Sequence, residues 1–132
     1  MIKVATVILE NPKGEILIHL RDNKPTIPFP NHWDLFGGRV EKGETPEQAM
    51  LREVKEEIGY NLKEYHFFKK YRVNTGDAHP NIKYVYIGKI NKPLGRITLY
   101  EGQKLRFVQK EEIPNIKFAN VLKDILIDYM RK

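Results

Sequence analysis

Three glutamates within five residues give this chain its clearest chemical feature. Glu53, Glu56 and Glu57 stand three and four positions apart, which places their carboxylates on one stripe of a helix. Carboxylates at that spacing repel by about 0.2–0.5 kcal/mol per pair, and near a helix C-terminus they also oppose the helix dipole. A hard divalent cation such as Mg²⁺ or Mn²⁺ takes oxygen ligands and would turn this repulsion into coordination. The alternative is a solvated helix face, the usual role of a Glu-rich stripe.

The helix that must position these glutamates has recognisable ends. Thr45 suits the N-cap, Pro46 the first helical position and Gln48 the third position of a capping box, and Gly59 suits the C-terminal stop. An apolar stripe runs beside the acidic one and consists of Met50, Leu51, Val54 and Ile58. The sequence therefore predicts an amphipathic helix between Thr45 and Gly59, with one face in the core and its neighbour acidic.

The wider spacing, over residues 38–60, resembles the Nudix box. Gly38 is followed after five residues by Glu44 and, after seven more, by the run Arg52-Glu53-Val54-Lys55-Glu56-Glu57-Ile58-Gly59-Tyr60. Every fixed Gly, Glu and Arg of the box is present, while Tyr60 stands where the family usually has an aliphatic residue. The resemblance implies a single Nudix domain over residues 1–132, folded as an α/β/α sandwich with a mixed β-sheet between helices.

The resemblance also implies a reaction and a set of ligands. Nudix proteins hydrolyse a nucleoside diphosphate linked to another moiety and use Mg²⁺ or Mn²⁺. Carried onto this chain, the metal ligands are Glu53, Glu56, Glu57 and the carbonyl of Gly37. Glu44 and Arg52 are expected to support catalysis by orienting the ligands, Arg52 lying one turn before Glu56. A surface salt bridge worth under about 1 kcal/mol is the alternative role for this pair.

Two short segments extend the resemblance into the C-terminal half. Glu101-Gly102-Gln103 and the later Ala119-Asn120 are similar to MutT-like nucleoside triphosphate pyrophosphohydrolases. The match implies that Glu101 is a further metal ligand or the catalytic base. It implies that Asn120 reads a purine base, for which its amide offers both a donor and an acceptor. The alternatives are a surface loop for Glu101 and a helix cap for Asn120.

Three further residues are candidate substrate contacts. Arg21 ends a strand-like run and could bind phosphate. Phe36 occupies the position before the two glycines, where the family commonly has proline, and so predicts a different pocket wall. Tyr84 shares a strand face with Tyr86, and this face either stacks on a base or forms part of the core.

Length and composition limit the other possibilities. With 132 residues, 41% hydrophobic and 30% charged, the chain fits one domain with a single core. It has no apolar run of the roughly 18–20 residues that a membrane span needs, so no membrane association is expected. A strand-like pattern begins at once, so no leader peptide is predicted and a cytoplasmic location follows by default. The sequence contains neither cysteine nor serine, which excludes a covalent hydrolase that uses either nucleophile.

Strand and helix patterns alternate along the chain. Strand-like runs cover residues 4–9, 15–21, 65–73, 82–90 and 104–108, and a proline-containing loop covers 22–32. A final amphipathic helix is predicted over residues 119–130, with Asn120 at or near its start, and Pro114 ends the region before it. These elements predict an α+β domain with a mixed sheet covered by helices.

Three functions compete. The first is metal-dependent hydrolysis of a nucleoside triphosphate, with oxidised purines as candidates, to monophosphate and pyrophosphate. The second keeps the chemistry but acts on ADP-ribose or a dinucleoside polyphosphate. The third is a non-catalytic nucleotide- or RNA-binding module, favoured by the net charge of +6 and the aromatic-basic stretch 66–71. The intact box glutamates favour an enzyme, so the expected partner is a small nucleotide, a nucleic-acid partner is not expected, and the oligomeric state stays open.

Overall fold

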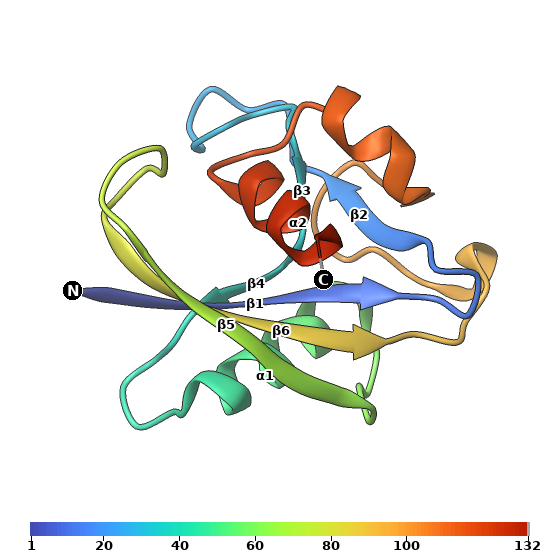
Figure 1. Cartoon of the computed structure of the whole chain (residues 1–132), viewed down its shortest axis with the longest axis horizontal. Helices are drawn as coiled ribbons and strands as arrows, with labels where there is room; N and C mark the ends of the chain where they lie inside the picture. The colour runs from blue at the N-terminus through green and yellow to red at the C-terminus, as the bar shows by residue number, and fades with distance from the viewer. Residues whose placement is uncertain (132) are drawn as a thin grey trace.

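A mixed β-sheet organises the chain, which a computed structural model describes over residues 1–131 (Figure 1). Within those residues the sheet has seven strands: β1 (Ile2–Glu10), β2 (Ile16–Leu20), β3 (Trp33–Asp34), β4 (Phe36–Arg39), β5 (Tyr65–Val73), β6 (Asn81–Lys89) and β7 (Lys104–Val108). The main order is β3-β2-β1-β6-β5, with β4 paired to β1 and β7 to β2. β1 and β6 run parallel and the remaining pairs run antiparallel, which makes the sheet mixed, as predicted.

The long strand β1 is the centre of this arrangement. It pairs with β6 along its whole length, but with β2 only at Leu9 and Glu10. Because β1 and β2 separate beyond that end, the short strand β4 can pair with the other half of β1. This pairing sets Gly37 opposite Thr6 and Gly38 opposite Ala5. The glycine pair is thereby held against the middle of the sheet.

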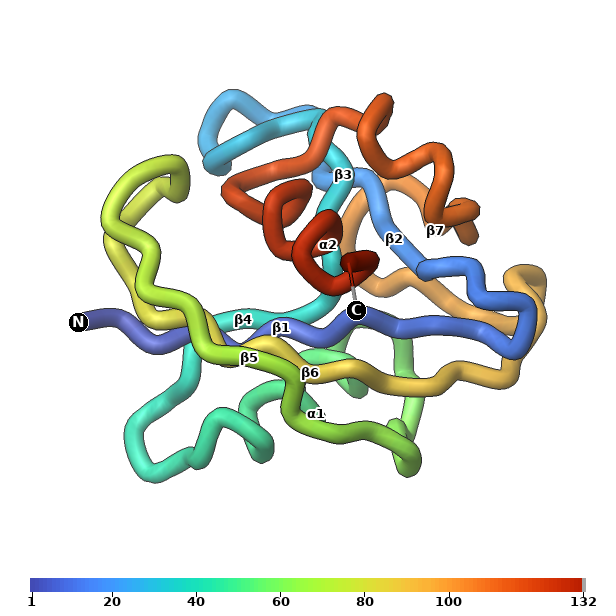
Figure 2. Tube along the Cα trace, viewed as in Figure 1, coloured from blue at the N-terminus to red at the C-terminus, as the bar shows by residue number. Residues whose placement is uncertain are grey.

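Helices cover both faces of the sheet. α1 (Pro46–Ile58) packs on one face, and α2 (Leu122–Met130) packs on the other with the 3₁₀ helix η2 (Lys110–Asn115). A second 3₁₀ helix, η1, spans Leu94–Arg96. Figures 1 and 2 show α1 and α2 on opposite sides of the sheet, which confirms the predicted α/β/α sandwich. None of the helices in residues 1–131 is long and apolar enough to cross a membrane.

The ends of α1 follow the predicted capping chemistry. The Thr45 hydroxyl accepts a hydrogen bond from the Gln48 N–H at 3.1 Å, and the Gln48 side chain accepts one from the Thr45 N–H at 2.9 Å. Gly59 ends the helix in the left-handed conformation at φ +64°. The buried face of the helix consists of Ala49, Met50, Val54 and Ile58. The acidic stripe next to it is therefore directed by core packing.

The final helix begins later than predicted. Asn120 adopts φ +57°, which is incompatible with a helix, and α2 begins at Leu122. Val121 is the N-cap residue and no side chain caps the helix, so the capping role considered for Asn120 is wrong. Pro114 lies inside η2 and does not end a strand region. The short strands β3 and β4 were not predicted, because two to four residues are too few for a periodic pattern.

The capping box yields a first prediction. Replacing Thr45 by Ala removes the acceptor of the Gln48 N–H and is expected to lower the free energy of unfolding by about 1 kcal/mol. Urea unfolding measures the change, with Thr98→Ala as the control because Thr98 is exposed and outside any helix. Equal stabilities for the two variants would contradict the role given to this cap.

Candidate active site

The glycine pair of β4 lies directly against the carboxylates of α1. The Gly37 N–H donates a hydrogen bond to Glu57 Oε1 at 2.9 Å. A Cβ on Gly38 would come within 1.9 Å of Glu53 Oε2, so any side chain there would displace that carboxylate. A Cβ on Gly37, at φ +150°, would meet the backbone oxygen of Ala5 at 2.1 Å. Glycine at both positions is what allows strand backbone and acidic helix to touch.

Burial and mutual repulsion raise the pKa values of two of these carboxylates. Burial raises the pKa of Glu57 to about 9, and the charges of Glu53, Asp34 and Glu101 add to the effect, against the hydrogen bond from Gly37. Burial is also the main cause that raises the pKa of Glu53, followed by Glu56 and Glu101, while Arg52 opposes it. Glu57 therefore keeps its proton at neutral pH unless a cation is supplied.

Arg52 joins the box glutamates into one network. Its guanidinium donates two hydrogen bonds to Glu44, from Nε at 2.7 Å and from Nη2 at 3.0 Å. It also donates to Glu56 Oε1 at 3.1 Å and to the carbonyl of Arg39 at 3.1 Å. The Arg52 hydrogen bond is the main cause that lowers the pKa of Glu44. The structure thus brings together Arg52 with Glu44 and Glu56, the pairs expected from the sequence.

The loop that carries Glu101 is anchored to the end of α1. The Tyr100 N–H donates to the carbonyl of Glu57 at 2.9 Å, and the Gln103 N–H donates to the carbonyl of Leu20 at 2.8 Å. Between these anchors Glu101 is exposed, and its charge raises the pKa of both Glu53 and Glu57. Glu57 and Glu101, which are 44 positions apart in the sequence, therefore interact electrostatically in the folded chain.

The carboxylates do not form a ready metal site in this conformation. Across residues 1–131, no three acidic or histidine side chains converge in a geometry that could hold an ion. The Glu57 carboxylate accepts a hydrogen bond from the Gly37 N–H, and the Glu56 carboxylate accepts one from Arg52. The donor set nevertheless consists of oxygens that repel one another, and the Glu56 side chain is 58% exposed and has space to turn.

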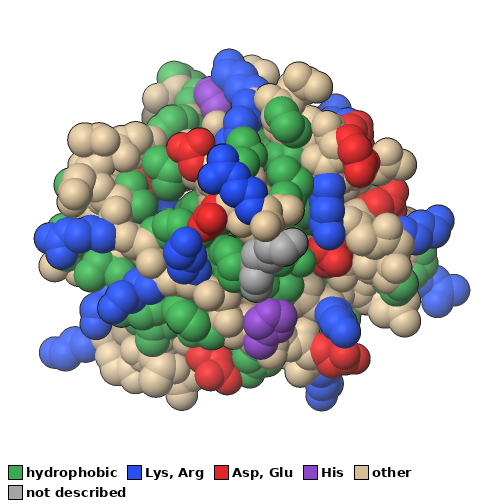
Figure 3. All heavy atoms as spheres, in the orientation of Figure 1, with side chains coloured by type: hydrophobic (Ala, Val, Ile, Leu, Met, Phe, Trp, Pro, Cys, Tyr) green, Lys and Arg blue, Asp and Glu red, His purple; other side chains and the backbone are tan. Residues whose placement is uncertain are grey.

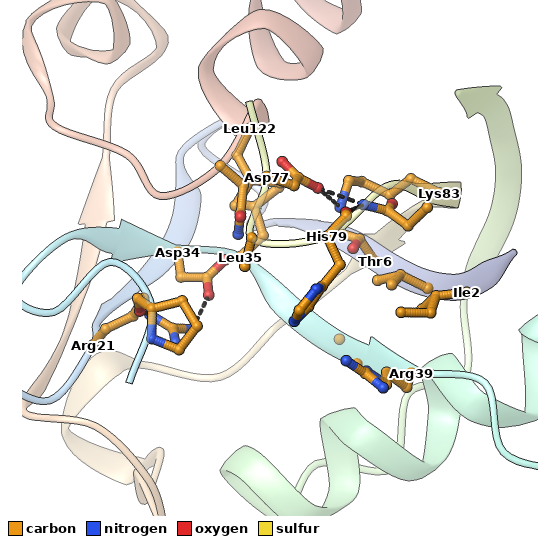
Figure 4. Close-up of a pocket in the computed structure, with 17 residues that line it drawn as sticks. Ile2, Thr6, Arg21, Asp34, Leu35, Arg39, Asp77, His79, Lys83 and Leu122 are labelled. Carbon is orange, nitrogen blue, oxygen red and sulfur yellow. Dashed lines mark hydrogen bonds and ion pairs between the residues drawn. The ribbon is translucent and has the colours of Figure 1, made fainter. Parts of the chain in front are cut away.

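A cavity of about 310 Å³ extends from the glycine pair to the start of α2 (Figure 4). Figure 2 shows two loops, residues 22–32 and 74–80, on the α2 side of the sheet. They contribute Pro28 and Ala78 to the wall of the cavity. Gly37, Gly38 and Arg39 line the cavity near α1. Its other lining residues are Ile2, Val4, Thr6, Arg21, Asp34, Leu35, Asp77, His79, Asn81, Lys83, Asn120 and Leu122.

Two of the predicted substrate residues line this cavity. Arg21 donates from Nη1 to Asp34 Oδ2 at 2.9 Å and from Nε to the Pro28 carbonyl at 3.0 Å. Burial is the main cause that raises the pKa of Asp34, and His19 and Arg21 partly offset it. Asn120 also lines the cavity, and its side chain makes no hydrogen bond to any residue of the described chain. Its amide is therefore available to a ligand.

The structure places the other two candidate substrate residues outside this cavity. Phe36 is fully buried, packs on the α1 side of the sheet and stacks on His19 with ring centroids 4.8 Å apart. It is part of the core and does not form a pocket wall. Tyr84 also packs on the α1 side, beside buried Tyr86, whereas the cavity opens on the α2 side. Strand alternation sends Lys83, and not Tyr84, toward the cavity.

Several cavity residues were missed from sequence, among them Asp34, Asp77 and Lys83. A signal existed for Lys83, because it stands on the same face of β6 as the aliphatic residues Val85 and Ile87. A charged residue on such a face indicates a buried polar site. No signal of this kind marked Asp77, which lies in an irregular loop.

Comparison with known proteins decides the family. The model of the NUDIX domain matches residues 2–129. The chain belongs to the Nudix family. The prediction drawn from residues 38–60 is confirmed, and the acidic face of α1 with its glycine pair is the Nudix box of this domain.

Named relatives and a solved Nudix structure support this assignment. The chain is 35% identical over 78 residues to the 8-oxo-dGTP diphosphatase of Escherichia coli, with 59% of each protein covered. It is 30% identical over 118 residues to the 8-oxo-dGTP diphosphatase of Haemophilus influenzae, covering 86% of this chain and 79% of that protein. The Nudix domain of Shewanella oneidensis NrtR, solved with ADP ribose, superposes with a TM-score of 0.82 at 15% identity, covering 99% of this chain and 87% of that one. At that identity the last similarity concerns the fold alone.

Replacing Gly37 and Gly38 by alanine is expected to change the free energy of unfolding by different amounts. Gly37→Ala forces a Cβ against strand backbone and should lower the free energy of unfolding by more than about 2 kcal/mol. Gly38→Ala meets only the end of the Glu53 side chain and should stay within about 1 kcal/mol of wild type. Chemical denaturation measures both variants. A Gly38 variant as unstable as the Gly37 variant would contradict this division.

The raised pKa of Glu57 predicts how stability depends on pH in the presence of a chelator. Between the ordinary value of 4.5 and about 9, the unfolded chain loses this proton before the folded chain does. The free energy of unfolding should therefore fall as pH rises through this window, by up to about 1.4 kcal/mol per pH unit. Glu57→Gln keeps an acceptor for the Gly37 N–H and should flatten the fall.

Urea unfolding at a series of pH values between those limits tests this expectation. Glu111→Gln is the matched control, because Glu111 is exposed and lies on η2, away from the box. The same pH dependence in wild type and in the Glu57 variant would show that ionisation of this carboxylate does not cause the loss of stability at higher pH.

Proposed function

We propose that this protein is a Nudix pyrophosphohydrolase that converts a nucleoside triphosphate to its monophosphate and pyrophosphate with the help of Mg²⁺ or Mn²⁺. The observation that carries the proposal is the mutually repelling carboxylate cluster of α1, held against Gly37 and Gly38, two glycines that also line a cavity of about 310 Å³. Two relatives are named 8-oxo-dGTP diphosphatases, so 6-oxo purine triphosphates, including oxidised ones, are the first substrates to test.

The residues proposed to hold the divalent cation are Glu53, Glu56 and Glu57, with the Gly37 carbonyl and Glu101 as further oxygen donors. The raised pKa values of Glu53 and Glu57 support this assignment, since a cation would offset the burial and the neighbouring negative charges that raise them. When bound, such an ion neutralises phosphate charge and lowers the pKa of water. Arg52 would hold Glu56 and Glu44 in orientation by the hydrogen bonds described above.

The chain's own residues account for the remaining needs of the reaction. Water adds to one phosphorus, the anhydride P–O bond breaks and pyrophosphate leaves, so no covalent nucleophile is required. We assign the proton of the attacking water to Glu101, with Glu53 as the alternative acceptor. Arg21 and Arg39, both at the cavity, would bind phosphate oxygens, and Asn120 would bind the base at the far end.

Two alternative functions make different predictions. Complex formation between the S. oneidensis Nudix domain and ADP ribose makes ADP-ribose the second substrate candidate. It would give AMP and ribose phosphate without pyrophosphate. A non-catalytic RNA-binding module would need a continuous basic surface, whereas the face in Figure 3 has Lys and Arg side chains interspersed with acidic ones.

A substrate screen with separate detection of pyrophosphate and phosphate tests the proposed function. With Mg²⁺ or Mn²⁺, we expect pyrophosphate from nucleoside triphosphates. Glu53→Gln and Glu57→Gln should each lower kcat by about 100-fold or more. The control Glu64→Gln, at a side chain 75% exposed, should retain activity. Full activity in both box variants would refute the site, and turnover of ADP-ribose without pyrophosphate release would favour the second substrate.

A further inference from the structure

A buried ion pair closes the end of the cavity that lies near α2. Lys83 Nζ lies 2.9 Å from Asp77 Oδ2, and the two side chains are only 4% and 5% exposed. Figure 4 shows the pair beside Leu122, away from Arg39 and the α1 end. Burying two charges costs several kcal/mol of desolvation, and an apolar pair of similar volume is often at least as stable. The neighbours of Lys83 on the same strand face, Val85 and Ile87, are apolar and buried.

The acceptor side of this pair already accepts from three groups of the protein. Asp77 Oδ2 accepts from Lys83 and, at 2.8 Å, from Asn81 Nδ2. Asp77 Oδ1 accepts from the Val121 N–H at 3.1 Å. These bonds connect β6, the loop 74–80 and the start of α2. Asp77 consequently has little capacity left for a ligand.

The ammonium group of Lys83 still has donors available for a ligand. Lys83 carries three N–H donors, and Asp77 is its one partner in the part of the chain that the structure describes. Both remaining donors belong to a side chain that lines the cavity. Asn120 lines the same cavity, but its amide carries both a donor and an acceptor and can adapt to either kind of base edge. Lys83 offers donors alone and therefore discriminates.

We propose that Lys83 is a specificity-determining residue that selects 6-keto purines, guanine and hypoxanthine, over adenine. This inference rests on the proposed function in that it takes the α2 end of the cavity as the base site. O6 and N7 of a 6-keto purine are adjacent acceptors that suit a lysine, whereas adenine presents its N6 amino donor at that place. Adenine would leave the buried ammonium facing another donor. The pair is neutral overall, so it suits an uncharged base better than a phosphate.

Calorimetric binding of GMP, IMP and AMP tests this selection without requiring hydrolysis. The wild-type protein is expected to bind GMP and IMP at least about tenfold more tightly than AMP. IMP separates the effect of O6 from that of the 2-amino group of guanine. Equal affinities for GMP and AMP, or no measurable binding of any of the three, would overturn the proposal.

Two variants isolate Lys83. In Asp77→Asn/Lys83→Met both charges are removed together, so no buried charge is left alone. In Lys83→Gln the side chain stays similar in size and becomes a neutral amide with both donors and an acceptor. Each should bring the ratio of GMP to AMP affinity toward one, whereas the control Lys63→Met, at an exposed lysine outside the cavity, should keep it. An unchanged ratio, or equal loss of GMP and AMP binding, would show that Lys83 does not read the base.

Turnover of GTP, ITP and ATP by the same proteins separates this inference from the proposed function. A preference for GMP that depends on Lys83, without any hydrolysis, would refute the enzyme and leave the base selection intact. Hydrolysis of GTP and ATP at equal rates, with equal binding of GMP and AMP, would refute the selection and leave the enzyme intact.

Discussion

The contact between the Gly37 N–H and the Glu57 carboxylate is the interaction on which the rest of this structure depends. It holds a repelling, partly desolvated carboxylate cluster against strand backbone, in an arrangement that raises the pKa of Glu57 to about 9. A neutral, solvated face would be more favourable for the helix alone. The divalent cation proposed above would offset this cost.

Strand pairing, helix packing and one loop together bring Gly37 and Glu57 into contact. β1 separates from β2 and accepts β4, which sets the glycine pair opposite Ala5 and Thr6. The apolar face of α1 packs on the same side of the sheet and turns its acidic stripe toward these glycines. The loop around Glu101 is then attached to the end of α1 through Tyr100. Core packing, strand pairing and one loop anchor together concentrate negative charge beside the glycine pair.

Much of this could be predicted from sequence, because local chemistry determines it. The caps of α1 depend on residues within a few positions, and the five longer strands have clear β-branched and aromatic runs. The family pattern added the grouping of Arg52 with Glu44 and Glu56. Which face of the sheet receives a given side chain was not predictable, because it depends on pairing between distant strands. For this reason Phe36 was wrongly expected to form a pocket wall, the choice between base stacking and core stayed open for Tyr84, and Lys83 was overlooked.

Manganese binding, followed by the electron paramagnetic resonance signal of free Mn²⁺, shows whether the carboxylate cluster holds a divalent cation. We expect the wild-type protein to remove Mn²⁺ from solution without any nucleotide present. Neutralising Glu53 and Glu57 together should weaken this binding by at least about tenfold. A wild-type protein that leaves Mn²⁺ free, or a double variant that binds it equally well, would contradict the claim that the carboxylate cluster exists to hold a cation.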